Sequence, residues 1–257
     1  MNLKSRLLRV IYNGMLTGMP SLMNNPYNKN TLYAPFNVLE NSIYINYKLD
    51  NKQYNLINNY LQNKKSNLKL VKTSILKEDN KDYFLSINIY NCTSPLFSIL
   101  TNESIIRCEI NTYVIDQDNN IGTLILDYSS SHTSFDSYNL IKRPDKSIEL
   151  TNTNNTLTGY VNNEDIDLYF SLCLNSILCN NRLSSDLIKY TDRIYYIDGI
   201  YDKLFYDTTL LNNPLVLLQD NDIEFSFNGC LFNKPESVFV FNQPINFVGG
   251  MWKNLFE

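Results

Sequence analysis

Residues 105–115 (Ile-Ile-Arg-Cys-Glu-Ile-Asn-Thr-Tyr-Val-Ile) carry the polar groups with the clearest chemical potential. Successive side chains of a strand point to opposite faces. One face would therefore hold Ile106, Cys108, Ile110, Thr112 and Val114. The other would hold the polar residues Arg107, Glu109 and Asn111, with Ile105 and Tyr113. Inside a barrel, Glu109 could act as an acid, a base or a charge partner, and Arg107 could hold an anionic substrate group. The alternative is a solvent-facing strand with a weak charge pair. Periodicity alone favours the alternative.

A second candidate is the segment Leu140-Ile-Lys-Arg-Pro-Asp-Lys146. A lysine acts as an amine nucleophile only when it is deprotonated, and both desolvation and a cationic neighbour lower its pKa toward that state. Lys142, Arg143 and Lys146 could form such a cluster, whereas Asp145 between them favours the charged ammonium. The local sequence favours the alternative, an exposed turn.

Several common chemistries lack their usual signals. The single histidine, His132, has no partner at the spacing of a catalytic triad, and we expect a loop or capping role for it. Glycine-rich phosphate loops, the G-x-S-x-G motif and the H-E-x-x-H motif are absent from the sequence. The five cysteines are scattered without a C-x-x-C pair, so we expect reduced thiols, no metal site and no cofactor.

Composition describes an ordinary folded chain with a skewed amino-acid usage. Apolar residues make up 44% of the 257 residues and charged residues 19%, with a net charge of −4. An acidic chain argues against nucleic acid as the main partner, and no apolar run is long enough to span a membrane. The 39 Asn and 19 Tyr stand against one Ala, Ala34, a bias that indicates an AT-rich genome rather than a chemistry.

The elements that must position these groups are mostly strands. Runs rich in β-branched and aromatic residues predict strands at 42–47, 82–90, 105–115, 122–128, 166–172, 193–198, 223–228 and 237–241. The turn-rich link 116–122 predicts a hairpin between two of them. Helical spacing predicts helices at 52–63 and 201–211. We therefore expect one mainly β domain over residues 1–257, an antiparallel barrel or sheet with a few peripheral helices.

The N-terminal segment 1–32 is predicted to be a helix and an extended arm that precede the β-rich core of 33–257. The first 39 residues contain no Asp or Glu and four basic residues, a pattern shared by transit peptides and by docking helices. The apolar residues Leu3, Leu7, Val10 and Ile11 fit one helix face. We favour a packed helix and a cytoplasmic protein.

The order of these segments resembles that of the acetoacetate decarboxylase-like family over about residues 33–170. The resemblance runs from Tyr33-Ala-Pro-Phe36 through the strand Ile43–Tyr47, the helix Tyr54–Leu61, the strand Asp82–Tyr90, the triplet Arg107-Cys-Glu109, and a strand–turn–Gly–strand element from Val114 through Gly122 to Tyr128. The lysine-bearing segment of the family would fall near Ile141–Lys146. Two of its patterns differ here, because Gly-Arg-Glu is absent and Pro-Lys-Lys has become Pro-Asp-Lys.

The resemblance implies a fold built around a cone-shaped β-barrel and chemistry through a Schiff base. Lys146 or Lys142 would be the nucleophile, with Arg143 or the other lysine lowering its pKa. Glu109 would lie near the carboxylate that leaves as carbon dioxide. The implied substrate is a small or lipid-like keto or hydroxy acid in an apolar barrel, bound by Arg107, Arg143, Asn111 and Tyr113.

A non-catalytic β-barrel is the competing hypothesis. The missing motifs, the 32 Tyr and Phe residues and the skewed composition favour a scaffold that binds an apolar ligand or a protein partner, such as a viral or parasite accessory factor. The sequence leaves a homo-oligomer open. The two hypotheses differ in whether residues 107–111 are enclosed or face solvent.

Overall fold

The computed structural model describes the backbone of residues 35–64, 67–75, 80–93, 105–132, 147–174, 195–197, 203–205, 215–218, 223–241, 245–248 and 250–252. Side chains are described within 41–64, 67–75, 80–92, 105–132, 147–174 and 223–240. The predicted N-terminal helix and arm, 1–32, lie outside these ranges.

A large sheet forms the body of the described structure, with the strand order β11-β14-β1-β3-β4-β5-β9, to which β15 adds through β1 and β2 through β4. Its strands are β1 (Pro35–Lys48), β2 (Lys69–Leu70), β3 (Phe84–Thr93), β4 (Ile105–Ile115), β5 (Ile121–Ser130), β9 (Tyr195–Ile197), β11 (Leu215–Leu218), β14 (Ser237–Phe241) and β15 (Ile245–Val248). Among the described pairs only β5–β9 is parallel. The mainly β, antiparallel prediction is confirmed.

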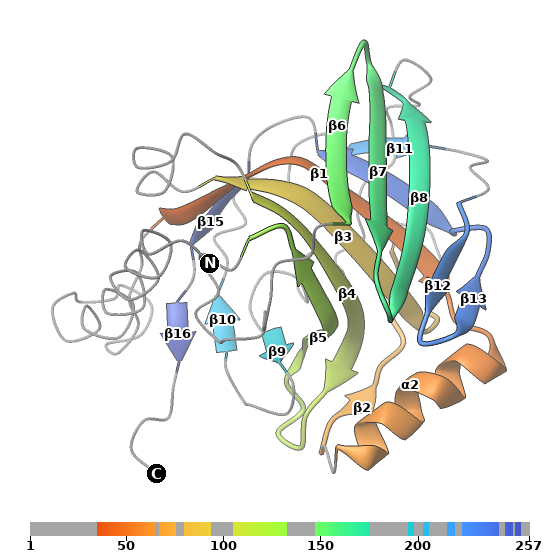
Figure 1. Cartoon of the computed structure of the whole chain (residues 1–257). Helices are drawn as coiled ribbons and strands as arrows, with labels where there is room; N and C mark the ends of the chain where they lie inside the picture. Colours follow the sequence, from red (N-terminus) through yellow and green to blue (C-terminus); the bar gives the residue numbers. More distant parts are fainter. Residues whose placement is uncertain are drawn as a thin grey trace, which may run out of the picture.

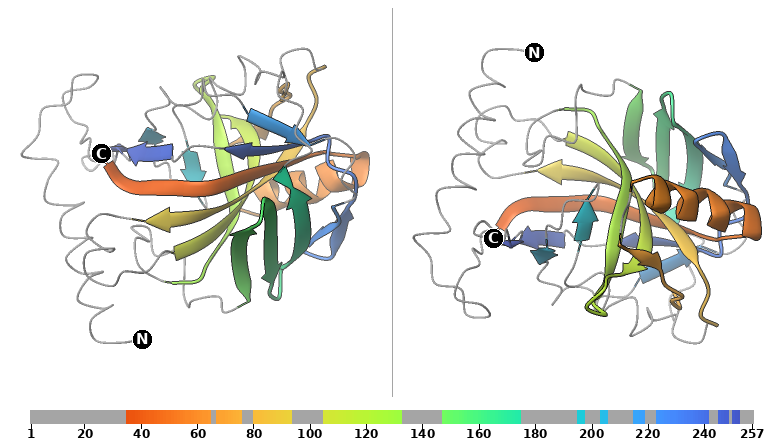
Figure 2. Two further views of the ribbon diagram at one scale, coloured as in Figure 1. Left: turned by 90° about the horizontal axis from the view of Figure 1, so that it is seen from above. Right: turned by 90° about the horizontal axis from the view of Figure 1, so that it is seen from below.

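A small sheet packs on the large one. It has the order β13-β12-β8-β7-β6, and its strands are β6 (Ile148–Thr153), β7 (Thr156–Asn162), β8 (Ile166–Cys173), β12 (Phe225–Phe227) and β13 (Cys230–Phe232). Figure 1 shows it standing across β1 and β3. The remaining strands, β10 (Lys203–Phe205) and β16 (Gly250–Trp252), pair with each other. Figure 2 shows β9, β10 and β16 on the side of β1 away from the small sheet.

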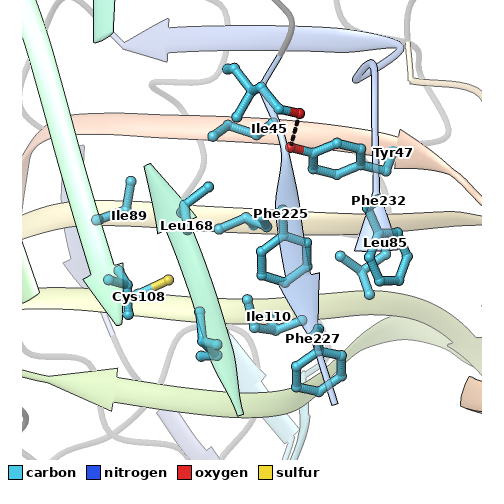
Figure 3. Packing of buried hydrophobic residues seen from close by; sticks show 14 of the residues in the cluster. Ile45, Tyr47, Leu85, Ile89, Cys108, Ile110, Leu168, Phe225, Phe227 and Phe232 are labelled. Carbon is cyan, nitrogen blue, oxygen red and sulfur yellow. Dashed lines mark hydrogen bonds between the residues drawn. The ribbon is translucent and has the colours of Figure 1, made fainter. Parts of the chain in front are cut away.

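The two sheets meet in an apolar core. We call the side of the large sheet that faces the small sheet the core face; it carries Ile43, Ile45, Tyr47, Leu85, Ile87, Ile89, Cys108, Ile110 and Val114. From the small sheet, Phe225 lies 5.9 Å from Tyr47 and 5.3 Å from Phe232 between ring centroids. Figure 3 shows several of these side chains, among them Tyr47, Phe225 and Phe232, between the two layers. Because successive side chains of a strand point to opposite faces, the alternate residues of these strands lie on the opposite side of the large sheet.

One helix, α2 (Asn51–Asn63), covers an end of this core. Its first turn is closed by a capping box, in which Gln53 N donates to Asp50 Oδ1 at 2.7 Å and Asp50 N donates to Gln53 Oε1 at 2.9 Å. Ile57 and Leu61, one turn apart, are buried against the core. The helix predicted at 52–63 is confirmed.

Each of the eight predicted strands overlaps a strand of the structure, including the hairpin of β4 and β5. The helix predicted at 201–211 is wrong where the chain is described, because residues 203–205 form β10. This strand pairs with residues 250–252, and local helical spacing carries no information about so distant a partner.

Asparagine supplies much of the turn geometry. Asn154 and Asn155, with φ values of 51° and 61°, join β6 to β7, and Asn228 and Gly229, with φ values of 49° and 71°, join β12 to β13. A two-residue hairpin loop of type I′ needs positive φ at both positions, which Asn tolerates better than most residues with a side chain. The abundant Asn thus takes turn positions that glycine commonly fills.

Candidate functional site

The face of the large sheet opposite the core face is polar, yet it is buried. We call it the polar face; its buried polar members are Ser42, Asn46, Ser86, Asn88, Tyr90, Arg107, Glu109, Asn111, Tyr113, Thr123, Ser130 and Ser237. Arg107 and Glu109 are only 4% and 6% exposed. The solvent-facing arrangement that periodicity favoured for residues 107–111 is therefore wrong. Alternation assigned the side chains to the correct faces, but which face is covered depends on distant parts of the chain.

Glu109 is at the centre of a group that we call the Glu109 cluster: Tyr90, Arg107, Glu109, Asn111 and Tyr128. The Tyr90 hydroxyl donates to Glu109 Oε1 at 2.5 Å, and Asn111 Nδ2 donates to Glu109 Oε2 at 3.4 Å. The Arg107 guanidinium carbon lies 5.4 Å from the centre of the Tyr128 ring. Strand pairing explains the grouping, since Tyr90 faces Arg107 across β3–β4 and Glu109 faces Tyr128 across β4–β5.

The environment of Glu109 shifts the titration of its carboxyl to higher pH. Burial raises the pKa of this carboxyl above its ordinary value of 4.5, against the hydrogen bonds from Tyr90 and Asn111 and the charge of Arg107, which lower it. Such a carboxyl can exchange a proton with a bound ligand closer to neutral pH than an exposed one.

Tyr90 remains a phenol across the physiological range. Burial raises its pKa well above the ordinary 10, and the negative charge of Glu109 adds to the effect. Its hydroxyl is therefore a permanent donor to Glu109. A donor fixed at one carboxyl oxygen orients the carboxyl plane and leaves the protonation change to Glu109 alone.

A bulge in β5 brings Tyr128 to this face. The β4–β5 register shifts between Ile110 and Asn111, so that Leu126 is the additional residue on β5. Without it, Thr123 and Tyr128, five positions apart, would point to opposite faces. With the bulge, Thr123 lies opposite Tyr113 and Tyr128 lies opposite Glu109, so that both point to the polar face.

A row of neutral hydrogen bonds lies next to the Glu109 cluster. Ser86 Oγ donates to Asn46 Oδ1 at 2.6 Å, and the Tyr113 hydroxyl lies 3.0 Å from Ser86 Oγ. Asn46 Nδ2 in turn lies 3.3 Å from Ser237 Oγ. Burial raises the pKa of Tyr113 to about 12. Tyr113, predicted as a substrate-binding residue, thus lies on the polar face but bonds within this row.

The remaining predicted residues divide into two groups. The structure brings Glu109, Arg107 and Asn111 together. Lys142, Arg143 and Lys146 lie outside the described residues, so their predicted roles stay predictions. Of the lysines whose side chains the structure describes, all are exposed. His132 follows β5, and its carbonyl accepts from Ser130 Oγ at 2.7 Å.

Sequence reasoning missed Tyr90 and Tyr128. A signal for Tyr90 was available, because Ser86, Asn88 and Tyr90 alternate with Leu85, Ile87 and Ile89 along one predicted strand. The bulge that turns Tyr128 toward Glu109 has no comparable signal.

Potential metal ligands do not cluster among the described residues. No group of three or more His, Cys, Asp or Glu side chains gathers within the described part of the chain. Four cysteines are described as thiols: Cys92, Cys108 and Cys230 are buried and Cys173 is exposed. Nor is any helix in the described ranges long and apolar enough to cross a membrane.

Similarity to known proteins is found at the level of structure. No protein-family model matches the sequence, and no curated protein matches it. Among solved structures, the chain is similar to an acetoacetate decarboxylase-like enzyme from Sphingomonas wittichii RW1, with a TM-score of 0.44 and 9% identity over 86% of this chain and 93% of that one. The match agrees with the family that the order of segments resembles. The side chains of the polar face, rather than this likeness, define the chemistry of the site.

Proposed function

We propose that this chain binds a small keto or hydroxy acid at the Glu109 cluster, with the substrate carboxylate on Arg107 and Glu109 as the proton donor. The observation that carries the proposal is the burial of Arg107 and Glu109 side by side with the polar groups Tyr90 and Asn111. Burying a cation and an acid is costly, and packed apolar residues of similar volume are often as stable. A buried carboxyl with a perturbed pKa is more typical of functional sites than of structural ones.

Each polar group has a distinct role in this proposal. The Arg107 guanidinium can hold a carboxylate through two parallel hydrogen bonds. Tyr90 and Asn111 fix the Glu109 carboxyl. When Glu109 is protonated, it can give its proton to a carbon that gains an electron pair as carbon dioxide leaves, and water then returns a proton to Glu109.

The full proposed reaction is decarboxylation of a β-keto acid through an imine. The free amine of Lys142 or Lys146 would condense with the ketone and release water. The bond to the carboxylate would break with its electron pair moving toward the imine nitrogen, and carbon dioxide would leave. Protonation of the resulting enamine carbon by Glu109 and hydrolysis of the imine would free the product and the lysine.

A second candidate is acid binding without catalysis. The exposure of every lysine with a described side chain favours it, because none of these can serve as a nucleophile beside Glu109. The two candidates share the Arg107 contact and differ only in the imine.

The first experiment measures binding of acetoacetate and 3-hydroxybutyrate by ligand-observed NMR. We expect binding by the native chain and by Lys48→Met, which removes an exposed cation, and its loss in Arg107→Met. Arg107→Lys keeps the positive charge but loses the two parallel hydrogen bonds of the guanidinium. It should therefore fold and bind more weakly than the native chain, which distinguishes loss of the guanidinium from misfolding. Equal binding by all four proteins would contradict the proposal.

The second experiment separates the two candidates. Borohydride reduction in the presence of acetoacetate, followed by peptide mapping, should give a stable adduct on Lys142 or Lys146 together with carbon dioxide release. Binding that depends on Arg107 without an adduct would establish the non-catalytic candidate. An adduct on an exposed lysine such as Lys234 alone would argue against the imine mechanism.

A further inference from the structure

Two buried polar atoms, one in the Glu109 cluster and one next to it, have unmet hydrogen-bonding capacity. In the part of the chain that the structure describes, Asn111 Oδ1 and Thr123 Oγ1 have no hydrogen-bond partner. Their residues are only 2% and 3% exposed. Buried polar atoms almost always have a partner, so two neighbouring exceptions need an explanation.

The two atoms belong to the same patch of the polar face. Thr123 lies directly opposite Tyr113, and Asn111 lies opposite Ile125, so Asn111 and Thr123 are diagonal neighbours on β4 and β5. Diagonal neighbours have Cα atoms about 7–8 Å apart, close enough for both side chains to contact one small group. Asn111 also donates to Glu109 Oε2 at 3.4 Å, which places the patch beside the proposed acid.

Another buried threonine on the same hairpin shows the ordinary arrangement. Thr112, 1% exposed, donates its hydroxyl to the carbonyl oxygen of Phe84 at 2.8 Å. The fold can thus satisfy a buried threonine here by a backbone contact. The hydroxyl of Thr123 lacks such a contact. The two threonines are close in the β4–β5 register, since Thr112 lies opposite Leu124 and Thr123 lies opposite Tyr113.

We infer that Asn111 and Thr123 form a subsite for a hydroxyl group of the substrate, which makes the substrate a hydroxylated carboxylic acid. One hydroxyl placed between them can donate to Asn111 Oδ1 and accept from Thr123 Oγ1. This inference rests on the proposed function for the carboxylate contact at Arg107 and adds the chemistry of the other end of the ligand. A site built to bind a hydroxyl rejects the analogue that lacks it, because its own buried groups then stay unpaired.

The spacing sets the distance between the two ends of the ligand. Glu109 and Asn111 are two positions apart on β4, a rise of about 6.6–6.8 Å. Arg107 lies a further two positions away on the same face, and its charge acts on Glu109, whose pKa it lowers. The hydroxyl would therefore lie several bonds from the carboxylate, and the ligands tested should vary that distance.

The test compares matched acids on matched variants. The probes are butyrate against 3-hydroxybutyrate and hexanoate against 6-hydroxyhexanoate, with dissociation constants measured by calorimetry. One pair should show about tenfold tighter binding of the hydroxylated member in the native chain, the value of one or two added hydrogen bonds. Thr123→Val should abolish the preference, whereas Thr112→Val should keep it.

Thermal unfolding of the free proteins gives an independent readout. Thr123→Val replaces an unpartnered hydroxyl with a methyl group and should raise the melting temperature, whereas Thr112→Val breaks a hydrogen bond and should lower it. Equal lowering by both variants would overturn the subsite. Equal, Arg107-dependent binding of both members of each pair would overturn the subsite and leave the proposed function standing. No binding of any acid would overturn both.

Discussion

The core face and the polar face of the large sheet are carried by the same strands, and both are buried. On β3, Leu85, Ile87 and Ile89 pack toward the small sheet, while Ser86 and Asn88 alternate with them toward the other side. Apolar groups need only close packing when they are buried, whereas each buried polar group needs a partner. The stability of the fold therefore accounts for the apolar side chains of the core face. It does not account for the polar face, with a buried acid, a buried cation and two unmatched atoms.

The largest effect is expected on the core face. Phe225 is fully buried among Tyr47, Phe227 and Phe232. Phe225→Ala should lower the free energy of unfolding by about 3–5 kcal/mol, because it removes a ring and leaves a cavity. Leu231→Ala, on the next strand and 53% exposed, should change it by less than about 0.5 kcal/mol. Urea unfolding measures both, and similar values would contradict the assigned core.

A tyrosine on each face sharpens the comparison. Tyr90→Phe removes the donor to Glu109 and should cost about 1–3 kcal/mol, because the buried acceptor left unmatched is a carboxyl that carries charge when ionised. Tyr47→Phe removes a 3.1 Å bond to the backbone carbonyl of Ile223, a neutral acceptor, and should cost less, about 0.5–1.5 kcal/mol. Only Tyr90→Phe should also change the pH dependence of stability below pH 9, since its hydroxyl lowers the pKa of Glu109.

The pH dependence itself distinguishes the faces. The pKa of Glu109 is raised above 4.5 in the folded chain. Between pH 4.5 and this higher folded pKa, the folded state therefore binds more protons than the unfolded state. The contribution of Glu109 is present below pH 4.5 and is lost as the pH rises through its folded pKa. Stability of the native chain should thus fall relative to Glu109→Gln as the pH rises through this window. Parallel pH profiles would show that Glu109 titrates normally.

The smallest effect is expected where the polar side of β1 reaches solvent. Lys48 Nζ lies 2.6 Å from Asp82 Oδ2, but the two side chains are 55% and 24% exposed. Water and salt screen such a pair, so Lys48→Met should leave the unfolding midpoint nearly unchanged. The small decrease that remains should be larger at low salt than at high salt, because salt weakens the ion pair. A loss as large as that of Tyr90→Phe would reverse the ranking of buried and exposed polar contacts.

The sequence predicted the strands better than it predicted their surroundings. Alternation in 105–115 assigned Arg107, Glu109 and Asn111 to one face because side-chain direction is a local property of a strand. Burial of that face depends on the rest of the chain, and periodicity favoured the wrong answer. The hairpin of β6 and β7 was missed because its Thr- and Asn-rich strands have little apolar signal, although Asn154 and Asn155 mark the turn.

Other features of the site have no local signature. The bulge at Leu126 arises from the register between β4 and β5 and determines which face Tyr128 joins. The partner of Glu109, Tyr90, lies 19 positions away. β10 pairs with residues near the end of the sequence, so local spacing predicted a helix there. Contacts of this kind follow from the fold as a whole.

The most direct test of a ligand site at Arg107 and Glu109 is an NMR titration of the Glu109 side-chain carboxyl, assigned by its absence in Glu109→Gln, with and without 3-hydroxybutyrate. We predict a pKa above 4.5 in the free protein, and a further rise with the acid bound, because the ligand carboxylate takes up the charge of Arg107 that lowers it. An ordinary pKa that the acid leaves unchanged would contradict the proposed site.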